Sequence, residues 1–191
     1  MEPILLDLPE RIETPRLTMR PPQPGDAPVL LEALTESLTE MRRFLAFLPW
    51  VACEQTLESA ELYCRNAHVN FTSRKDLPFL LFEKATGRLV GSSGLHRMVW
   101  ATPKAEVGYW CRNSALGKGY VTEAVNALVG YAFEHLAAVR VELVTDERNA
   151  RSRKVAERCG FTLEGILHDE RRGPDGELAS TCIYAKLRGA A

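Results

Sequence analysis

Residues 106–133 read EVGYWCRNSALGKGYVTEAVNALVGYAF, and this stretch decides how the rest of the chain can fold. It opens with an alternating strand pattern at 106–111, passes through the turn Gly117-Lys118-Gly119, and continues as an amphipathic helix pattern to 133. The free N–H groups and the dipole at the start of a helix attract anions. Glycine lets the backbone approach a phosphate closely, because it carries no Cβ. The stretch therefore predicts an anion site between a strand and a helix.

The glycine turn alone does not identify the anion. A dinucleotide fingerprint needs a third glycine at position 122, where the chain has Thr122, and a Walker loop needs a Lys-Ser/Thr pair that is absent here. A turn glycine between a strand and a helix is also common without any ligand. A plain structural turn therefore stays open at this point.

The composition fits a single soluble domain over residues 1–191. The chain is 46% hydrophobic and 26% charged, which suits a sizeable core. Its 24 Lys and Arg residues nearly balance 25 Asp and Glu residues, so the net charge of −1 favours no nucleic-acid partner. No apolar run reaches the roughly 18 residues of a membrane span, and the acidic segment 1–13 does not resemble a secretion signal. We expect no membrane partner.

The cysteines favour a reducing compartment. They are odd in number and lack CxxC spacing, which argues against a disulfide framework and against a zinc site. The five are Cys53, Cys64, Cys111, Cys159 and Cys182. We therefore expect a cytoplasmic protein that holds no metal.

Patterning along the whole chain predicts a mixed α+β sheet of six to seven strands with helices on both faces. The expected strands lie at 16–20, 78–83, 89–96, 106–111, 140–145, 161–167 and 182–187. Helices are expected from 27, at 54–70, at 120–133 and at 149–159, with a separate short segment at 40–48. Asp26 is expected to cap the first helix, and Gly160 to end the last one.

Four motifs in this order resemble the GNAT acyl-CoA N-acetyltransferases. They are Glu106-Val107-Gly108-Tyr109-Trp110, Gly117-Lys118-Gly119-Tyr120-Val121-Thr122-Glu123-Ala124, Asn149-x-x-Ser152 and Cys159-Gly160-Phe161-x-x-Glu164-Gly165. The segments 14–20 and 47–51 are similar to the RimJ/RimL group, which acetylates the N-terminal residue of ribosomal proteins. The chain departs from the usual pattern at Ser114, where the phosphate loop often begins with Gln or Arg, and at Ser180, where much of the group has Asp.

The resemblance implies the GNAT fold, in which the fourth and fifth strands splay apart as a V, here between 107–112 and 140–145. Acetyl-CoA would place its pantetheine arm in the splay and its pyrophosphate on the amides of 117–120. The coenzyme residues implied are Trp110, Cys111, Arg112, Gly117, Lys118, Gly119, Tyr120, Thr122, Asn149 and Ser152. The resemblance also suggests a homodimer.

Asn149 and Ser152 have two interpretations. Asn is a preferred N-cap and Ser is common in the first helical turn, so plain capping would explain both. The resemblance implies that Asn149 holds the pantetheine amide and that Ser152 stabilises or protonates the leaving thiolate. A thiol has an ordinary pKa near 8.5, so this help need only be modest.

Glu106 is the candidate catalytic base, because GNAT enzymes often keep one at the start of the fourth strand. Strand alternation places Glu106, Gly108 and Trp110 on one face. A strand-edge salt bridge would explain Glu106 equally well. Secondary candidates for the base are His96, His168, Glu170 and Tyr184.

Three residues are candidates for binding the acceptor substrate. Trp50, with Phe44 and Phe47 before it, would wall the acceptor site, although a core position is the alternative. Trp100, in the irregular segment 99–104, is a candidate if it is exposed. Glu170 could bind the ammonium group of the substrate.

The predicted reaction is direct attack of a primary amine on the thioester, with the N-terminal amine of a protein such as a ribosomal protein as acceptor. Neutralising a lysine at pH 7 costs about 4–5 kcal/mol, against about 1 kcal/mol for an N-terminus, so a weak or water-relayed base suffices for an N-terminus. Two alternatives stay open. One is an enzyme on a small amine (amino acid, polyamine or antibiotic) or with a longer acyl-CoA, and the other is a non-catalytic acyl-CoA-binding module.

Overall fold

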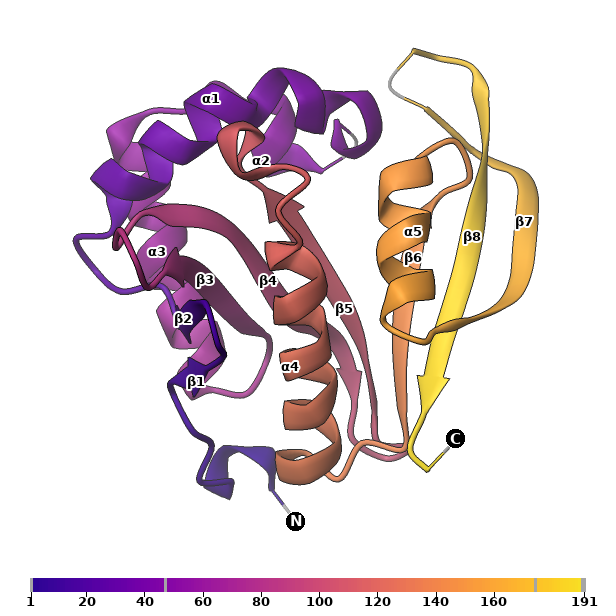
Figure 1. Cartoon of the computed structure of the whole chain (residues 1–191), viewed down its shortest axis with the longest axis horizontal. Coiled ribbons are helices and arrows are strands. Elements are labelled where there is room, and N and C mark those ends of the chain that lie inside the picture. Colours follow the sequence, from indigo (N-terminus) through magenta and orange to yellow (C-terminus); the bar gives the residue numbers. More distant parts are fainter. Residues whose placement is uncertain (1, 47, 174, 190–191) are drawn as a thin grey trace.

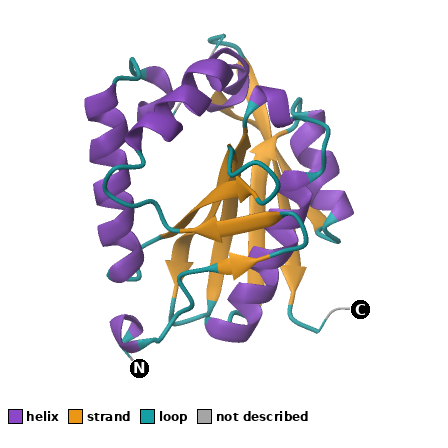
Figure 2. Ribbon diagram, turned by 60° about the vertical axis from the view of Figure 1, so that its left-hand side comes forward, coloured by secondary structure: helices purple, strands orange, loops and turns teal. Residues whose placement is uncertain are grey.

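The structure of the protein is a computed structural model that describes residues 2–46, 48–173 and 175–189. These residues form one sheet of eight strands in the order β1-β2-β3-β4-β5-β6-β8-β7, with helices on both faces (Figures 1 and 2). The strands are β1 (Ile12–Glu13), β2 (Leu17–Arg20), β3 (Leu77–Glu83), β4 (Leu89–Val99), β5 (Lys104–Cys111), β6 (Arg140–Asp146), β7 (Thr162–Arg172) and β8 (Leu178–Leu187). The helices are α1 (Ala27–Leu45), α2 (Pro49–Ala52), α3 (Leu57–Thr72), α4 (Tyr120–His135) and α5 (Ala150–Arg158), with 3-10 turns η1 (Pro3–Leu5) and η2 (Asn113–Ala115).

Burial on both faces explains why the central strands are apolar throughout. Along β3, Phe79 and Leu81 join the core that includes α4, while Leu80 between them joins the core formed with α1 and α3. Successive strand residues point to opposite faces, so a strand with helices on both sides needs apolar residues at every position. The predicted α+β architecture is confirmed. Within the described residues, none of the helices is long and apolar enough to cross a membrane.

β5 and β6 are parallel neighbours at one end only. Their register runs from Lys104–Arg140 to Glu106–Glu142, and no described residue beyond these pairs across the two strands. β6 meanwhile stays paired with β8 as far as Asp146, so the two halves of the sheet separate (Figure 1). The predicted splay is confirmed. The short strand β1 makes the splayed strands the fifth and sixth of eight, rather than the fourth and fifth of six to seven.

The first helix is longer than predicted. α1 is one continuous helix, so the separate segment at 40–48 is wrong. The buried stripe of α1 includes Leu30, Leu34, Ser37 and Met41 and keeps helical spacing to its end. Ser37 masks this stripe in the sequence because it is polar. In the fold its hydroxyl donates to the carbonyl four residues earlier at 2.7 Å, which satisfies it inside the core.

The predicted cap at Asp26 is also wrong. Its backbone is already helical, with φ −77° and ψ −7°, and its side chain does not cap α1. The carboxylate accepts two hydrogen bonds of 2.7 Å from the Arg20 guanidinium and one of 2.7 Å from the Gln23 N–H. A bidentate arginine is a stronger partner than a helix N–H, so Asp26 ties the end of β2 to the start of α1 instead.

β7 forms one edge of the sheet and is exposed over most of its length. It continues to Arg172, beyond the predicted end at 167. Its pairing with β8 shifts register between Leu163 and Gly165 and again between Leu167 and Arg171. Asp169, inside the second shift, has a φ of 50°. Both irregularities bend the edge strand away from a flat ladder.

We expect Leu128→Ala to lower the free energy of unfolding by about 2–5 kcal/mol, because a fully buried leucine of α4 would leave a cavity. Leu62→Ala on α3 is the matched control. Leu62 is 60% exposed, and its loss should cost less than about 0.5 kcal/mol. Urea unfolding measures both variants, and equal losses would contradict the core position of Leu128.

Candidate active site

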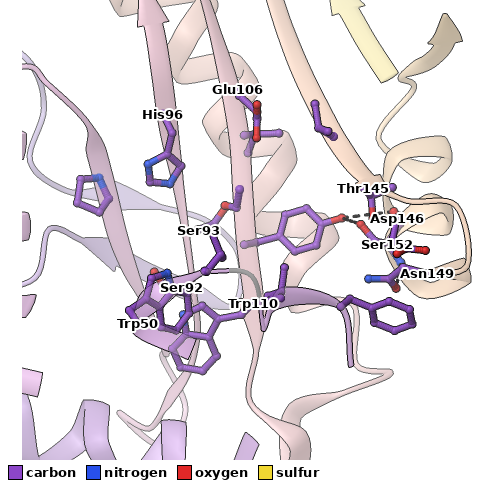
Figure 3. Close-up of a pocket in the computed structure, with 18 of the residues that line it drawn as sticks. Trp50, Ser92, Ser93, His96, Glu106, Trp110, Thr145, Asp146, Asn149 and Ser152 are labelled. Atoms are coloured by element: carbon purple, nitrogen blue, oxygen red, sulfur yellow. Dashed lines mark hydrogen bonds between the residues drawn. The ribbon is translucent and has the colours of Figure 1, made fainter. Parts of the chain in front are cut away.

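A cavity of about 790 Å³ opens where β5 and β6 separate (Figure 3). Residues of α1–α3 line one side, β4 and β5 the middle, and β6, the start of α5, β7 and β8 the other side. Among the lining residues are Trp50, Tyr63, His96, Glu106, Trp110, Asp146, Asn149, Ser152 and Glu170. Ligand pockets typically have volumes of about 300–1,000 Å³, so this cavity can hold a ligand at the splay.

β5 presents different side chains to the two sides of the splay. Trp110 packs in the cluster formed with α1 and α3, whereas Val107 belongs to the α4 cluster and Tyr109 packs against it. The even-numbered residues of this strand thus face α1 and α3, and the odd-numbered ones face α4 and α5. The cavity joins these two sides because β6 no longer closes the strand edge.

Ser152 meets a tyrosine inside the cavity. Its Oγ lies 2.8 Å from the hydroxyl of Tyr109, which also lies 3.3 Å from the Ser152 carbonyl oxygen. Burial raises the pKa of Tyr109 well above its ordinary value. The phenol therefore stays protonated and can donate to Ser152. Tyr109 is a residue of the cavity that the sequence motifs did not predict as part of the site. Strand alternation from Glu106 places it on the opposite face from Glu106, and this position is the signal that could have found it.

Asn149 caps α5, as the capping interpretation predicts. Its Oδ1 accepts a hydrogen bond of 3.1 Å from the Ser152 N–H. Both residues also line the cavity. Capping fixes the first turn of α5 and so holds the Ser152 hydroxyl toward Tyr109 (Figure 3). The two interpretations of this pair are therefore compatible.

Glu106 lines the cavity and is also ion-paired. Its Oε2 accepts a hydrogen bond of 2.6 Å from Arg97, while its own side chain is mostly buried. The strand-edge salt bridge is therefore present. Whether Glu106 also acts as the base stays a prediction.

The phosphate-loop glycines adopt the backbone that only glycine favours. Gly117 and Gly119 have φ of 75° and 81°, and Gly119 stands directly before α4. Arg16 braces this turn by donating to the Lys118 carbonyl at 2.8 Å and by pairing with Glu123 at 2.6 Å. The first N–H groups of α4 have no carbonyl partners within the helix. The turn is exposed, so these donors can reach an anion.

Tyr120 and Thr122 sit in the first turn of α4. The Tyr120 hydroxyl donates to Glu83 on β3, which fixes the ring, and Arg16 lies over that ring at 4.8 Å. Thr122 is half-buried, and its carbonyl oxygen lies 3.6 Å from the Cys159 thiol. The prediction assigns the backbone amide of Tyr120 and the side-chain hydroxyl of Thr122 to the pyrophosphate.

Arg112 is occupied by the scaffold. It is 3% exposed, and its guanidinium donates to Glu32 and to Glu36 on α1. Glu36 also accepts a 2.6 Å hydrogen bond from the Ser114 N–H. The Arg112 backbone N–H donates to Val90 at 2.9 Å. These contacts assign Arg112 to holding the loop before α4 rather than to touching the coenzyme with its side chain.

Cys111 is half-buried at the end of β5 and is not among the residues that line the cavity. Burial raises the pKa of its thiol to about 11. The thiol therefore stays protonated near neutral pH and is a poor nucleophile. Any contact of Cys111 with a coenzyme would be through its backbone or as packing.

Most of the candidates for binding the acceptor line the cavity. Trp50 on α2 is 37% exposed and lines the cavity, and Phe44 lines it as well, while Phe47 lies outside the described residues. Glu170 on β7 also lines it and accepts a hydrogen bond of 2.5 Å from the Thr181 hydroxyl. Trp50, Phe44 and Glu170 thus all line the cavity, and their role toward the acceptor stays a prediction.

Trp100 does not lie at this cavity, and the prediction that it binds substrate is wrong. The residue is half-buried and packs against the core that includes α4. With Pro103, Leu136 and Ala138 it lines a small separate hollow of about 10 Å³. The ring covers the turn between β4 and β5, where apolar burial explains it fully.

The secondary candidates for the base differ in whether they line the cavity. His168 on β7 is exposed and is not among the lining residues. Tyr184 is buried, and its hydroxyl accepts a hydrogen bond of 3.2 Å from Arg153. His96 does line the cavity, with its Nδ1 3.3 Å from an oxygen of Asp76. Of these residues, His96 and Glu170 can meet a substrate.

The splayed mixed sheet, the glycine turn at a helix start and the serine hydroxyl in the splay are the features that the resemblance to the acyl-CoA-dependent transferases predicts. The chain matches the model of the acetyltransferase (GNAT) domain over residues 16–162. It belongs to the GNAT acetyltransferase family and is an acetyl-CoA-dependent N-acetyltransferase.

The relatives point to the RimJ/RimL-like group within the family. YdaF of Bacillus subtilis, which has the provisional name of ribosomal N-acetyltransferase, is 32% identical over 80% of this chain and 81% of its own. A provisionally described ribosomal-protein-serine acetyltransferase from Vibrio cholerae has a similar structure, with 25% identity, a TM-score of 0.76 and coverage of 98% and 100%. A RimL ribosomal α-N-protein acetyltransferase in complex with coenzyme A shares the fold, with 20% identity, a TM-score of 0.85 and coverage of 95% and 100%.

Glu36→Gln should destabilise the protein at pH 7 by roughly 1–2 kcal/mol, because the carboxylate holds Ser114 and Arg112. Hydrogen bonds from Ser114 and from Arg112 lower the pKa of Glu36 to about 2. A lowered pKa means that this stabilisation is present above the unfolded value of 4.5 and is lost as the pH falls toward 2.

The difference between wild type and Glu36→Gln should therefore shrink between about pH 5 and pH 2, as measured by urea unfolding at several pH values. Glu134→Gln, at an exposed position on α4, is the control and should change stability by less than about 0.5 kcal/mol at each pH. A difference for Glu36→Gln that stays constant with pH would contradict this role of the carboxylate.

Proposed function

We propose that this N-acetyltransferase modifies the N-terminal α-amine of a protein, with a ribosomal protein as the favoured class. The observation that carries the proposal is the cavity at the splay, which brings the Ser152–Tyr109 pair, Trp50 and Glu170 to one space. The likeness to YdaF, provisionally named for a ribosomal substrate, supports the choice of acceptor.

On the donor side, the coenzyme would pair with the open edges of β5 and β6. Beyond Glu106 and Glu142 these strands have backbone groups that no longer bond to each other. An extended pantetheine arm carries amides that can join such an edge like an added strand. Its pyrophosphate would then reach the amides from Gly117 to Tyr120, at the start of α4.

The departing thiolate would be stabilised by Ser152. Its hydroxyl is aimed by the cap at Asn149 and by the phenol of Tyr109. Because burial keeps Tyr109 protonated, the pair can pass a proton toward the sulfur without either residue being charged beforehand. Such general acid help typically contributes a factor of about 10²–10⁴.

On the acceptor side, the cavity suits a cationic amine beside an apolar wall. Glu170 and Glu106 place carboxylates at the lining, and Trp50 supplies an aromatic face. Carboxylates attract an ammonium group, and an aromatic face adds a cation–π contact. An α-amine also releases its proton more easily than a lysine, by about 3–4 kcal/mol at pH 7.

A small amine is the second candidate acceptor. The cavity volume of about 790 Å³ is that of a small-molecule pocket, and helices α1–α3 cover its acceptor side. A peptide N-terminus needs only its first residues inside such a pocket. Kinetic comparison of the two acceptor classes therefore decides between them.

We expect peptides that begin with Ala, Ser or Met to release coenzyme A at least tenfold faster than the same peptides with a blocked N-terminus. The blocked peptides keep an internal lysine and are the matched control. The release is followed by thiol titration and by the mass of the product. Faster turnover of polyamines or free amino acids than of every peptide would contradict the protein acceptor and favour a small amine.

Ser152→Ala should lower kcat by more than tenfold while leaving acetyl-CoA affinity nearly unchanged, because the hydroxyl acts mainly on the leaving sulfur. Thermal protection by acetyl-CoA measures the affinity of each variant. Ser73→Ala, at the exposed C-cap of α3, is the control and should keep wild-type kcat. A wild-type rate in Ser152→Ala would reduce Ser152 to a residue of the helix start.

A further inference from the structure

His96 lies on β4 in the wall of the cavity, on the side of the sheet that faces α1 and α3 (Figure 3). Across the strands it pairs with Glu106, which is also the last residue of β5 that pairs with β6. Gly108, the next residue of β5 on the same face, is already in the open part of the splay. His96 therefore stands at the level where the two strands separate.

Two glycines leave room for the imidazole ring. A Cβ on Gly94 would lie 3.0 Å from His96 Nε2, and a Cβ on Gly108 would lie 3.2 Å from its Cδ2. Both distances are tighter than ordinary contacts, so a larger residue at either position would press on the ring. The ring thus lies over bare backbone. The next residue of β5, Tyr109, leaves the strand on the opposite face, where its hydroxyl meets Ser152.

Asp76 orients the ring. This residue directly precedes β3, and its Oδ1 lies 3.3 Å from His96 Nδ1. A carboxylate at Nδ1 favours the tautomer that carries the proton there, which leaves the lone pair on Nε2. In the part of the chain that the structure describes, Nε2 has no hydrogen-bond partner, and the side chain is 39% exposed. The lone pair is therefore available to a ligand in the cavity.

Glu106, by contrast, has its carboxylate occupied. The Arg97 guanidinium donates to it at 2.6 Å, and the Glu106 side chain is 18% exposed. An amine would have to share or displace that guanidinium to give up a proton there. On the same face, the Nε2 lone pair of His96 has no such competitor among the described residues.

We propose that His96 is the general base of acetyl transfer and that Asp76 is its positioning residue. This inference rests on the acetyl-transfer function proposed above and names the group that takes the proton. The acceptor enters as the neutral amine. Its nitrogen bonds to the thioester carbon while Nε2 takes one of its two protons, and the C–S bond breaks. The departing sulfur takes a proton from the Ser152 hydroxyl, which regains one from water, and the imidazolium returns its proton to water.

The ionisable groups around His96 come from each element packed against it. Asp76 contacts the ring from the segment before β3, and Glu106 pairs with His96 across the strands from β5. Tyr63 on α3 lines the same cavity. Arg97 follows His96 on β4 and is paired with Glu106. Variants of these residues separate the proton acceptor from its neighbours.

The test measures kcat/KM against pH for the best amine of the wild-type enzyme, with His96→Gln, Asp76→Asn and Glu106→Gln as variants. In wild type, the acceptor amine and the base must both lose a proton, so the acid limb of log kcat/KM should have a limiting slope of two. His96→Gln should lose about 10²–10³-fold in kcat/KM and keep a slope of one. Asp76→Asn should lose less of its kcat/KM than His96→Gln does. Glu106→Gln should keep the limiting slope of two.

Imidazole added to the His96→Ala variant should raise its kcat/KM at least tenfold. A purely structural role of His96 would not allow this rescue. His168→Gln, at an exposed histidine outside the cavity, is the matched control and should keep the wild-type rate and slope. Thermal protection by acetyl-CoA shows that each variant is folded.

A rate for His96→Gln within threefold of wild type, a retained slope of two, or no rescue by imidazole would each overturn the inference. A loss of slope in Glu106→Gln alone would assign the base to Glu106. The proposed protein acceptor would be contradicted by a different result, namely that the wild-type enzyme acetylates no protein N-terminus. The role of His96 is then tested with the small amine that the wild-type enzyme does acetylate.

Discussion

The early end of the pairing between β5 and β6 is the constraint on which the rest of the structure depends. After Glu106 and Glu142 the two strands diverge, and each leaves an edge of backbone N–H and C=O groups without a strand partner. Such groups are costly inside a protein unless something bonds to them. An extended ligand can meet that need, as in strand addition. The packing is arranged accordingly, with α1 and α3 on one face and α4 and α5 on the other.

Two arginines fix the connection that leads from the splay to α4. Arg112 anchors its beginning to two carboxylates of α1, and Arg16 anchors its end to the Lys118 carbonyl and to Glu123. Although burial opposes it, hydrogen bonds from Thr14 and Arg16 hold the pKa of Glu123 below its ordinary value. The amides at the start of α4 are thus held in place before any anion arrives, which lowers the entropy cost of binding. Helix α1 and the loop before α4 are therefore held together by ion pairs and hydrogen bonds.

Local patterns predicted what depends on neighbours in the chain. Strand alternation, the Gly117 and Gly119 turn and the cap at Asn149 all follow from residues a few positions apart. The errors arose where contacts outside a single helix or strand decide. Asp26 binds the Arg20 guanidinium instead of capping its own helix. Trp100 packs over a turn, and its burial could not be predicted because the segment around it has no regular pattern. The contact of Asp76 with His96 joins residues 20 positions apart, and neither helical nor strand periodicity predicts it.

The irregular edge strand β7 has a consequence for how the protein coexists with other chains. An edge with a regular ladder of unpaired N–H and C=O groups recruits further strands and so seeds aggregation. Here two register shifts and the left-handed backbone at Asp169 break that ladder, and the charged run from Asp169 to Arg172 lies along it. The sheet is therefore open to an extended ligand between β5 and β6, whereas its edge at β7 is poorly suited to pairing with a strand of another chain.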